Sequence, residues 1–210
     1  MFADVNYVES SAPATGVIIY KLFEYMNIEL DQYIAKHLYA AISGDTGNFK
    51  YSNVTPETFF IAGKLIEFEI EHWKISKAIF DTEDFNSMRI KGELSREIKL
   101  YCNGLIAVVC VEKELIEKYN ADEKDVSDTV DLARRVRGCE VAVSLKETDK
   151  GIRVSLRSGE YADVSKIAAI YGGGGHVRAA GFLVENLNIS QLEENLVKNI
   201  EEHLIELKLL

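Results

Sequence analysis

The sequence predicts an α/β protein of two domains, a mostly helical N-terminal part followed by a domain with a mixed sheet. The chain has 210 residues, which is enough for two small domains. Before residue 81 apolar residues recur at helical spacing, whereas from residue 98 β-branched and aromatic residues gather in short runs between helical patterns. We therefore expect domains at 1–85 and 98–210, joined by a linker at 86–97.

Helical patterns make up the first domain. After the helix-entry signal ESSAPAT, Ile18, Leu22 and Met26 share one helical spacing, and in LDQYIAKHLYAAIS the residues Ile34, Leu38, Ala41 and Ile42 share another. A turn-rich stretch, GDTGNFKYSNVTP, precedes a third helix in PETFFIAGKLIEF. A fourth helix is predicted in EHWKISKAIF, ending near DTEDFNS.

The second domain alternates strands with helices. Residues 98–112 read as a strand pair, DVSDTVDLARRV as a helix and CEVAVSLKETDKGIRVSLRS as a hairpin around TDKG. A helix in DVSKIAAIY, a glycine loop, a strand in GFLVE and a long final helix complete the chain. This order predicts a mixed sheet covered by helices.

Composition restricts the classes of function. Acidic residues outnumber basic ones 34 to 24, giving a net charge of -10, so a general nucleic-acid coat is excluded. The cysteines Cys102, Cys110 and Cys139 show no CxxC spacing and are interpreted as reduced, buried thiols. No apolar run is long enough to span a bilayer, and the N-terminus has no export signal, so we expect a cytoplasmic protein.

The run YGGGGHVRAAGF at residues 171–182 is the strongest candidate site. Four glycines exceed what a helix C-cap needs, and successive glycines can turn their N–H groups to one side to hold a phosphate. We expect a short helix beginning at His176 to add its positive end, with Arg157 and Ser158 at a strand end nearby. A tight turn without a ligand is the alternative, and Arg178 is interpreted as a surface charge.

Asp45, in SGDTGNF, is a second candidate. It reads either as a turn residue or as a carboxylate offered to a hard divalent cation, and one carboxylate cannot make a catalytic metal site. The histidines His37, His72 and His203 lie in helical patterns and are interpreted as surface or hydrogen-bonded side chains.

These segments together resemble a known family. SLRSGEYADVSKIAAIYGGGGHVRAAGF is similar to the C-terminal DHH-associated domain of the Asp-His-His (DHH) phosphoesterases, and DVNYVESSAPATGVIIYKLF and AAISGDTGNF resemble segments that follow the signature motif of that family. The resemblance covers essentially the whole chain and is greatest to the nano-RNase/pAp phosphatase branch. It implies a DHH phosphoesterase remnant followed by a DHH-associated domain.

The resemblance also implies roles for single residues. The family holds two manganese ions (Mn²⁺) by aspartates and histidines of four motifs, of which Asp45 matches the fourth. The first three motifs would precede FADVNYVE, so we expect the chain alone to have little or no hydrolase activity. The residues implied to contact the substrate phosphate are Arg157, Gly173, Gly174, Gly175 and His176.

Two functions remain open at this point. The first is manganese-dependent hydrolysis of short oligoribonucleotides or pAp by the complete family enzyme, and the second is a regulatory module that binds nucleotides without catalysis. The C-terminal domain of alanyl-tRNA synthetases, which also has a glycine-rich loop, is a distant third possibility. Expected partners are these small nucleotides, with neither a membrane nor long duplex nucleic acid, and a homodimer is left open.

Overall fold

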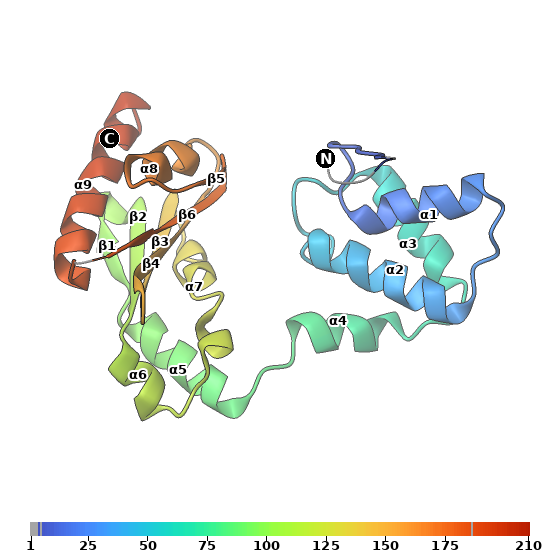
Figure 1. Cartoon of the computed structure of the whole chain (residues 1–210), viewed down its shortest axis with the longest axis horizontal. Coiled ribbons are helices and arrows are strands. Elements are labelled where there is room, and N and C mark those ends of the chain that lie inside the picture. Colours follow the sequence, from blue (N-terminus) through green and yellow to red (C-terminus); the bar gives the residue numbers. More distant parts are fainter. Residues whose placement is uncertain (1–3, 5, 186) are drawn as a thin grey trace. The chain divides into compact units, whose positions relative to one another are not determined.

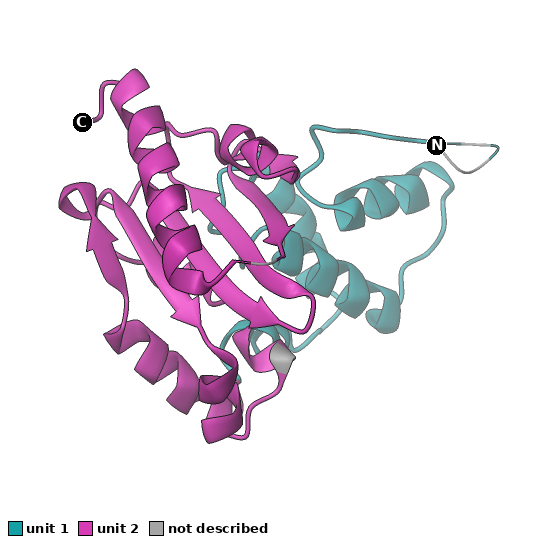
Figure 2. Ribbon diagram, turned by 60° about the vertical axis from the view of Figure 1, so that its left-hand side comes forward, with its two compact units in different colours: residues 1–82 teal, residues 83–210 magenta. Residues whose placement is uncertain are grey.

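The computed structural model describes residues 4, 6–185 and 187–210, which divide into two compact units. Unit 1 ends at Thr82 and unit 2 begins at Glu83, as coloured in Figure 2. Each hydrophobic cluster lies within one unit, so each unit has a core of its own. The assignment of 1–85 and 98–210 to two domains of the enzyme family stays a prediction.

Unit 1 is helical, as predicted. Its helices are α1 (Thr15–Tyr25), α2 (Gln32–Asp45), α3 (Pro56–Ile66) and α4 (His72–Phe80). Side-chain caps explain where α2 and α3 begin. The Asp31 carboxylate accepts the N–H of Ile34 at 2.7 Å to cap α2, and the Thr55 and Thr58 side chains form a reciprocal capping box at α3.

The buried face of α1 is not the one that carries the regularly spaced residues Ile18, Leu22 and Met26. Val17 and Tyr20 point into the core of unit 1, whereas Leu22 and Met26 are exposed. Gly16 explains why this face of α1 is buried. A Cβ at Gly16 would lie only 3.1 Å from the Ala41 Cβ, so α1 and α2 approach each other closely on that side. The apolar spacing Ile18–Leu22–Met26 thus marks an outer face of this helix.

Unit 2 is built on a mixed sheet of six strands with the order β1-β2-β3-β4-β6-β5, confirming the predicted α/β class (Figure 1). Strands β2 and β3 are parallel, and the other neighbouring pairs are antiparallel. The strands are β1 (Lys99–Tyr101), β2 (Ile106–Val111), β3 (Val141–Thr148), β4 (Gly151–Ser158), β5 (Gly174–His176) and β6 (Ala179–Val184).

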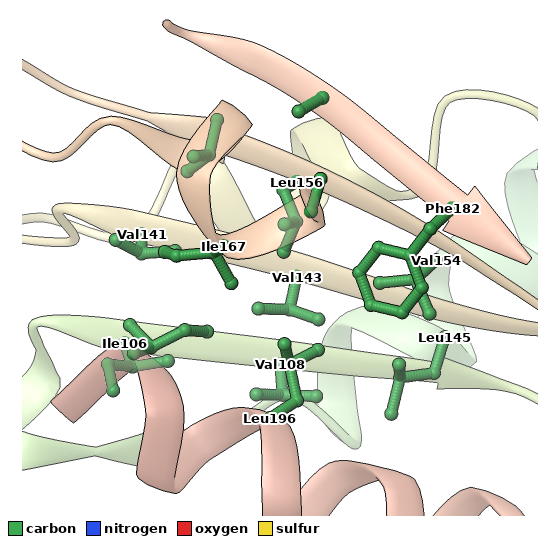
Figure 3. Close-up of a cluster of buried hydrophobic side chains, with 14 of the residues drawn as sticks. Ile106, Val108, Val141, Val143, Leu145, Val154, Leu156, Ile167, Phe182 and Leu196 are labelled. Atoms are coloured by element: carbon green, nitrogen blue, oxygen red, sulfur yellow. The ribbon is translucent and has the colours of Figure 1, made fainter. Parts of the chain in front are cut away.

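Helices pack on both faces of this sheet. On one face Val143, Leu156 and Phe182 pack against Ile167 of α8 (Val164–Ile170) and Leu196 of α9 (Ile189–Glu206), as Figure 3 shows. On the opposite face, β2 and β3 pack against three elements: α5 (Phe85–Arg96), the 3-10 turn Glu123–Val126 and α7 (Val130–Arg134). The remaining short elements of the unit are the 3-10 turn Cys102–Gly104 and α6 (Lys113–Lys118).

Two α-helices and one strand were not predicted from the sequence. Helix α5 occupies most of the stretch interpreted as a linker; only Ile90 and Leu94 of its apolar residues are buried, too few to give a clear helical stripe. Helix α6 is six residues long, and β5 lies inside the glycine run. Within the described parts of the chain, no helix is both long and apolar enough to cross a bilayer.

The cysteines are free and half-buried, in agreement with their interpretation as reduced thiols. Burial raises the pKa of the Cys110 thiol to about 12, helped by the nearby Glu193 carboxylate. This carboxylate, almost fully buried on α9, accepts hydrogen bonds from Lys99 and from Tyr101, each at 2.7 Å. Glu193 thus fastens α9 to the edge strand β1.

Candidate functional site

Each glycine of the run Gly172–Gly175 has a different structural environment. Gly172 follows α8 in the left-handed region with φ of 74°, and the Gly173 N–H closes the helix end on the Ala168 carbonyl at 2.9 Å. A Cβ on Gly173 would lie 2.4 Å from the Gly181 carbonyl oxygen of β6. The helix cap and this contact with β6 therefore account for the first two glycines.

The next two glycines belong to strand β5. Gly175 has φ of 148°, and a Cβ there would lie 2.6 Å from the Ala180 Cα, so this position also requires glycine. A Cβ on Gly174, by contrast, would meet no heavy atom within 4 Å. Gly174 is therefore the one glycine of the run for which neither crowding nor backbone angle requires the absence of a side chain.

The prediction of a short helix beginning at His176 is wrong. His176 is the last residue of β5, and a two-residue turn, Val177–Arg178, leads directly into β6. The close approach of the glycines to β6 favours a hairpin because two backbones can pair where side chains would clash. The positive end of a helix therefore does not contribute at His176.

The strand register aligns the predicted phosphate residues. Ala179 on β6 pairs with Arg157 on β4 and, on its other side, with His176 on β5. Residues directly opposite in antiparallel strands project from the same face, and neighbouring strands lie about 4.8 Å apart. Arg157 and His176 therefore lie on one face with their Cα atoms about 10 Å apart. The small side chain between them is that of Ala179.

The predicted phosphate residues on β4, Arg157 and Ser158, project from opposite faces of the strand and differ in how many hydrogen-bond donors remain free. The Arg157 guanidinium is half-buried and donates one hydrogen bond, to the Leu156 carbonyl at 3.0 Å, which leaves most of its five N–H donors for a ligand. Ser158 is buried, and its hydroxyl donates to the Val177 carbonyl at 3.3 Å. In this arrangement Ser158 holds the hairpin turn in place.

Arg178 has a role that the sequence analysis missed. Although the residue is exposed, its guanidinium donates to the Ala162 carbonyl at 2.9 Å and to the Glu160 carbonyl. The same loop, residues 160–162, is also bound by Glu140, whose carboxylate accepts hydrogen bonds from the N–H groups of Tyr161 and Ala162 at 2.8 and 2.7 Å. No sequence spacing signals these contacts, because they join residues far apart in the chain.

The loop held in this way leads into α8, which ends at the glycine run. The Asp163 side chain caps α8 and accepts hydrogen bonds from Ser165, which lower the pKa of the Asp163 carboxyl below its ordinary value. The Nε2 atom of His203 lies 3.3 Å from the Asp163 N–H, so this histidine is satisfied by a partner as predicted. Both flanks of the glycine run are thus fixed.

Asp45 belongs to unit 1 and is the last residue of α2. Its side chain is exposed and forms no hydrogen bond or ion pair with the rest of the described chain. A carboxylate at the negative end of a helix is electrostatically unfavourable and is stabilised by a cation. Within the described residues, no group of three or more His, Cys, Asp or Glu side chains is placed to hold a metal ion.

Comparisons with known proteins agree with this architecture. The DHHA1 domain family matches residues 103–206. The chain is 30% identical over 204 residues to the bifunctional oligoribonuclease and PAP phosphatase NrnA of Thermus thermophilus, and 30% identical over 183 residues to that of Bacillus subtilis. These matches cover 97% and 86% of this chain but 61% and 58% of the relatives, so the chain spans about 60% of their length.

A solved structure shows the same fold. The exopolyphosphatase-related protein of Bacteroides fragilis superposes with a TM-score of 0.88 at 22% identity, over 94% of this chain and 60% of that protein. The aligned row of Arg157 and His176 lies in the region matched to the DHHA1 family. The chain thus contains a DHHA1 domain at residues 103–206 and is related to the NrnA proteins over nearly its whole length.

Proposed function

We propose that the chain binds the phosphate of a short oligoribonucleotide or of pAp at strands β4, β6 and β5 of its DHHA1 domain, as part of a DHH phosphoesterase. In this proposal Arg157 and His176 hold the phosphate, and Gly174 lets the ligand approach the strand backbone closely. The complete enzyme would hydrolyse its substrate with manganese, in the cytoplasm. Relatives named oligoribonuclease and PAP phosphatase support this substrate class.

The observation that carries the proposal is the cross-strand row of Arg157, Ala179 and His176. In this row Arg157 and His176 flank Ala179, whose methyl group leaves room above the sheet for a ligand. Strand β5 is the edge strand of the described sheet, so its outward N–H groups lack a strand partner there. Guanidinium and imidazole N–H groups bind phosphate through charge-assisted hydrogen bonds. Arg157 forms no ion pair with the described residues, so its charge is available to a ligand.

The Asp45 carboxylate could serve as one ligand of a divalent cation, because it is exposed at the negative end of α2. Bound metal in this family would activate water and stabilise charge on the phosphate oxygens. The described residues contain no further cluster suited to such an ion, so we assign no reaction step to a metal held by these 210 residues.

Binding of pAp tests the phosphate site. Isothermal titration calorimetry in the presence of EDTA should detect pAp binding to the chain, and Arg157→Gln and His176→Ala should each weaken it. A charge-assisted hydrogen bond contributes about 1.5–3 kcal/mol, or roughly 10- to 100-fold in affinity. The matched control is Arg135→Gln, which replaces an exposed arginine directly after α7. Unchanged affinity in both site variants would refute the assignment.

Hydrolysis separates the two functional hypotheses. With Mn²⁺ we expect the 210 residues alone to leave pAp intact, and clear turnover would contradict this part of the proposal. A chimera carrying the N-terminal part of the Thermus thermophilus relative before residue 1 should release phosphate from pAp. A regulatory module without catalysis predicts binding in both proteins and turnover in neither.

A further inference from the structure

A pair of like charges lies on the same face of the sheet as the candidate phosphate site. Lys146 on β3 pairs directly with Arg153 on β4, so both side chains project from one face. Like charges directly opposite each other destabilise an antiparallel pair. A carboxylate partner would normally relieve this repulsion.

Neither cation has such a partner in the described part of the chain. The side chains of Lys146 and Arg153 take part in no hydrogen bond or ion pair there. Lys146 is nevertheless held in place, since only 9% of the residue is exposed, beside Val111 of β2. Every fully buried side-chain nitrogen or oxygen among the described residues has a partner, so the Lys146 ammonium reaches solvent at the end of a buried stem.

The position of this pair relates it to the first site. Arg153 and Arg157 lie four residues apart on β4 and project from the same face, which separates their Cα atoms by about 13 Å. Between them the face is lined by small residues, because Ser155 pairs with Gly181, which in turn pairs with Gly174. We call the surface from Lys146 and Arg153 to Arg157 and His176 the cation strip.

We propose that Lys146 and Arg153 form a second phosphate position, which takes an internal phosphate of a short oligoribonucleotide whose end phosphate lies at Arg157 and His176. This inference rests on the proposed function. A separation of about 13 Å corresponds to roughly two to four nucleotides, given a rise of about 3.4 Å per stacked nucleotide and more when extended. One ribose separates the phosphates of pAp, so pAp uses the first position alone.

The test compares a short with a longer ligand. Fluorescence anisotropy competition in EDTA would measure the affinities of pAp and of the 5′-phosphorylated tetranucleotide pApApApA for wild type, Lys146→Gln and Arg153→Gln. We expect each variant to bind the tetranucleotide about 5- to 20-fold more weakly and pAp as well as wild type does. The slope of log affinity against log salt for the tetranucleotide should also fall by about 0.7 per lost phosphate contact.

The control is Lys150→Gln, which removes an exposed lysine from the turn of the same hairpin and should change neither affinity. Because each site variant removes a like-charge contact, its melting temperature should equal or exceed that of wild type. Arg153 is exposed, so we expect its replacement to leave the fold intact, and the Arg153 variant decides the question should the Lys146 variant be poorly folded.

Equal losses for both ligands, or no loss for the tetranucleotide, would overturn the second position. Absence of pAp binding, or pAp binding that does not depend on Arg157, would instead overturn the proposed function. The two failures are therefore distinguishable.

Discussion

At the scale of single residues, the fold accounts for three glycines of the run Gly172–Gly175 and leaves the fourth without a structural reason. Gly173 and Gly175 are required because β6 passes too close for a Cβ, and Gly172 is favoured by its left-handed conformation. Gly174 is subject to neither demand. Because Gly174 pairs with Gly181, which pairs with Ser155 on the same face as Arg157, a side chain at position 174 would project into the space proposed for the ligand.

Alanine substitutions should therefore behave differently at neighbouring positions. We expect Gly174→Ala to change the free energy of unfolding by less than about 1 kcal/mol while weakening pAp binding roughly 10-fold. Gly173→Ala should destabilise the protein by about 2 kcal/mol or more, because its Cβ would overlap backbone atoms. Urea unfolding combined with calorimetry would measure both. Full pAp affinity in Gly174→Ala would show that the ligand does not approach this strand.

At the scale of elements, the hairpin β5–β6 depends on contacts made outside it. Arg178 in the hairpin turn donates to carbonyls of the loop before α8, and Glu140, the residue directly before β3, holds that loop from the other side. His176 is two residues away from this anchor. The Arg178 side chain, which is not expected to touch the phosphate, thus helps to fix the strand that carries His176, a predicted phosphate-binding residue.

Loss of this anchor should loosen the hairpin. In Arg178→Ala we expect faster hydrogen exchange at the backbone amides of residues 174–180 and several-fold weaker pAp binding, while β3 and β4 keep their protection. Arg178→Lys, which keeps the charge but cannot grip two carbonyls in the same way, should restore little. Weak binding with unchanged exchange would instead point to direct contact between Arg178 and the ligand.

The sequence predicted elements with strong periodicity and missed those whose formation depends on tertiary packing. The helices of unit 1, the β3–β4 hairpin and the final helix carry clear patterns or caps. Helix α5 has few buried residues, and β5 forms because glycines allow β6 to approach, a contact that local propensity cannot reveal. The alignment of Arg157 with His176 likewise required the order β4-β6-β5, which a linear pattern does not contain.

At the scale of the whole molecule, the candidate functional residues are divided between two units that each have a core of their own. The candidate phosphate residues and the cation strip all lie in unit 2, and Asp45 lies in unit 1. Each unit buries its own apolar clusters. Unit 1 also exposes apolar side chains on α1, including Tyr25, which is 86% exposed. A homodimer nevertheless stays a prediction.

This division predicts that phosphate binding survives separation of the units. A fragment spanning residues 83–210 should fold cooperatively and bind pAp within about threefold of the full chain, because its core and its candidate site are complete. Circular dichroism melting and calorimetry would check folding and affinity separately. A folded fragment without pAp affinity would mean that unit 1 is needed for the site.

The carboxylate of Glu140 also has a spectroscopic consequence. It accepts three backbone N–H groups, those of Glu160, Tyr161 and Ala162, at 3.1, 2.8 and 2.7 Å. Short hydrogen bonds to a charged acceptor deshield the amide proton, so these amides should resonate downfield of most others in a proton–nitrogen correlation spectrum. Since Arg178 joins the same loop to the hairpin, their peaks would report ligand binding at His176 without any label placed in the site.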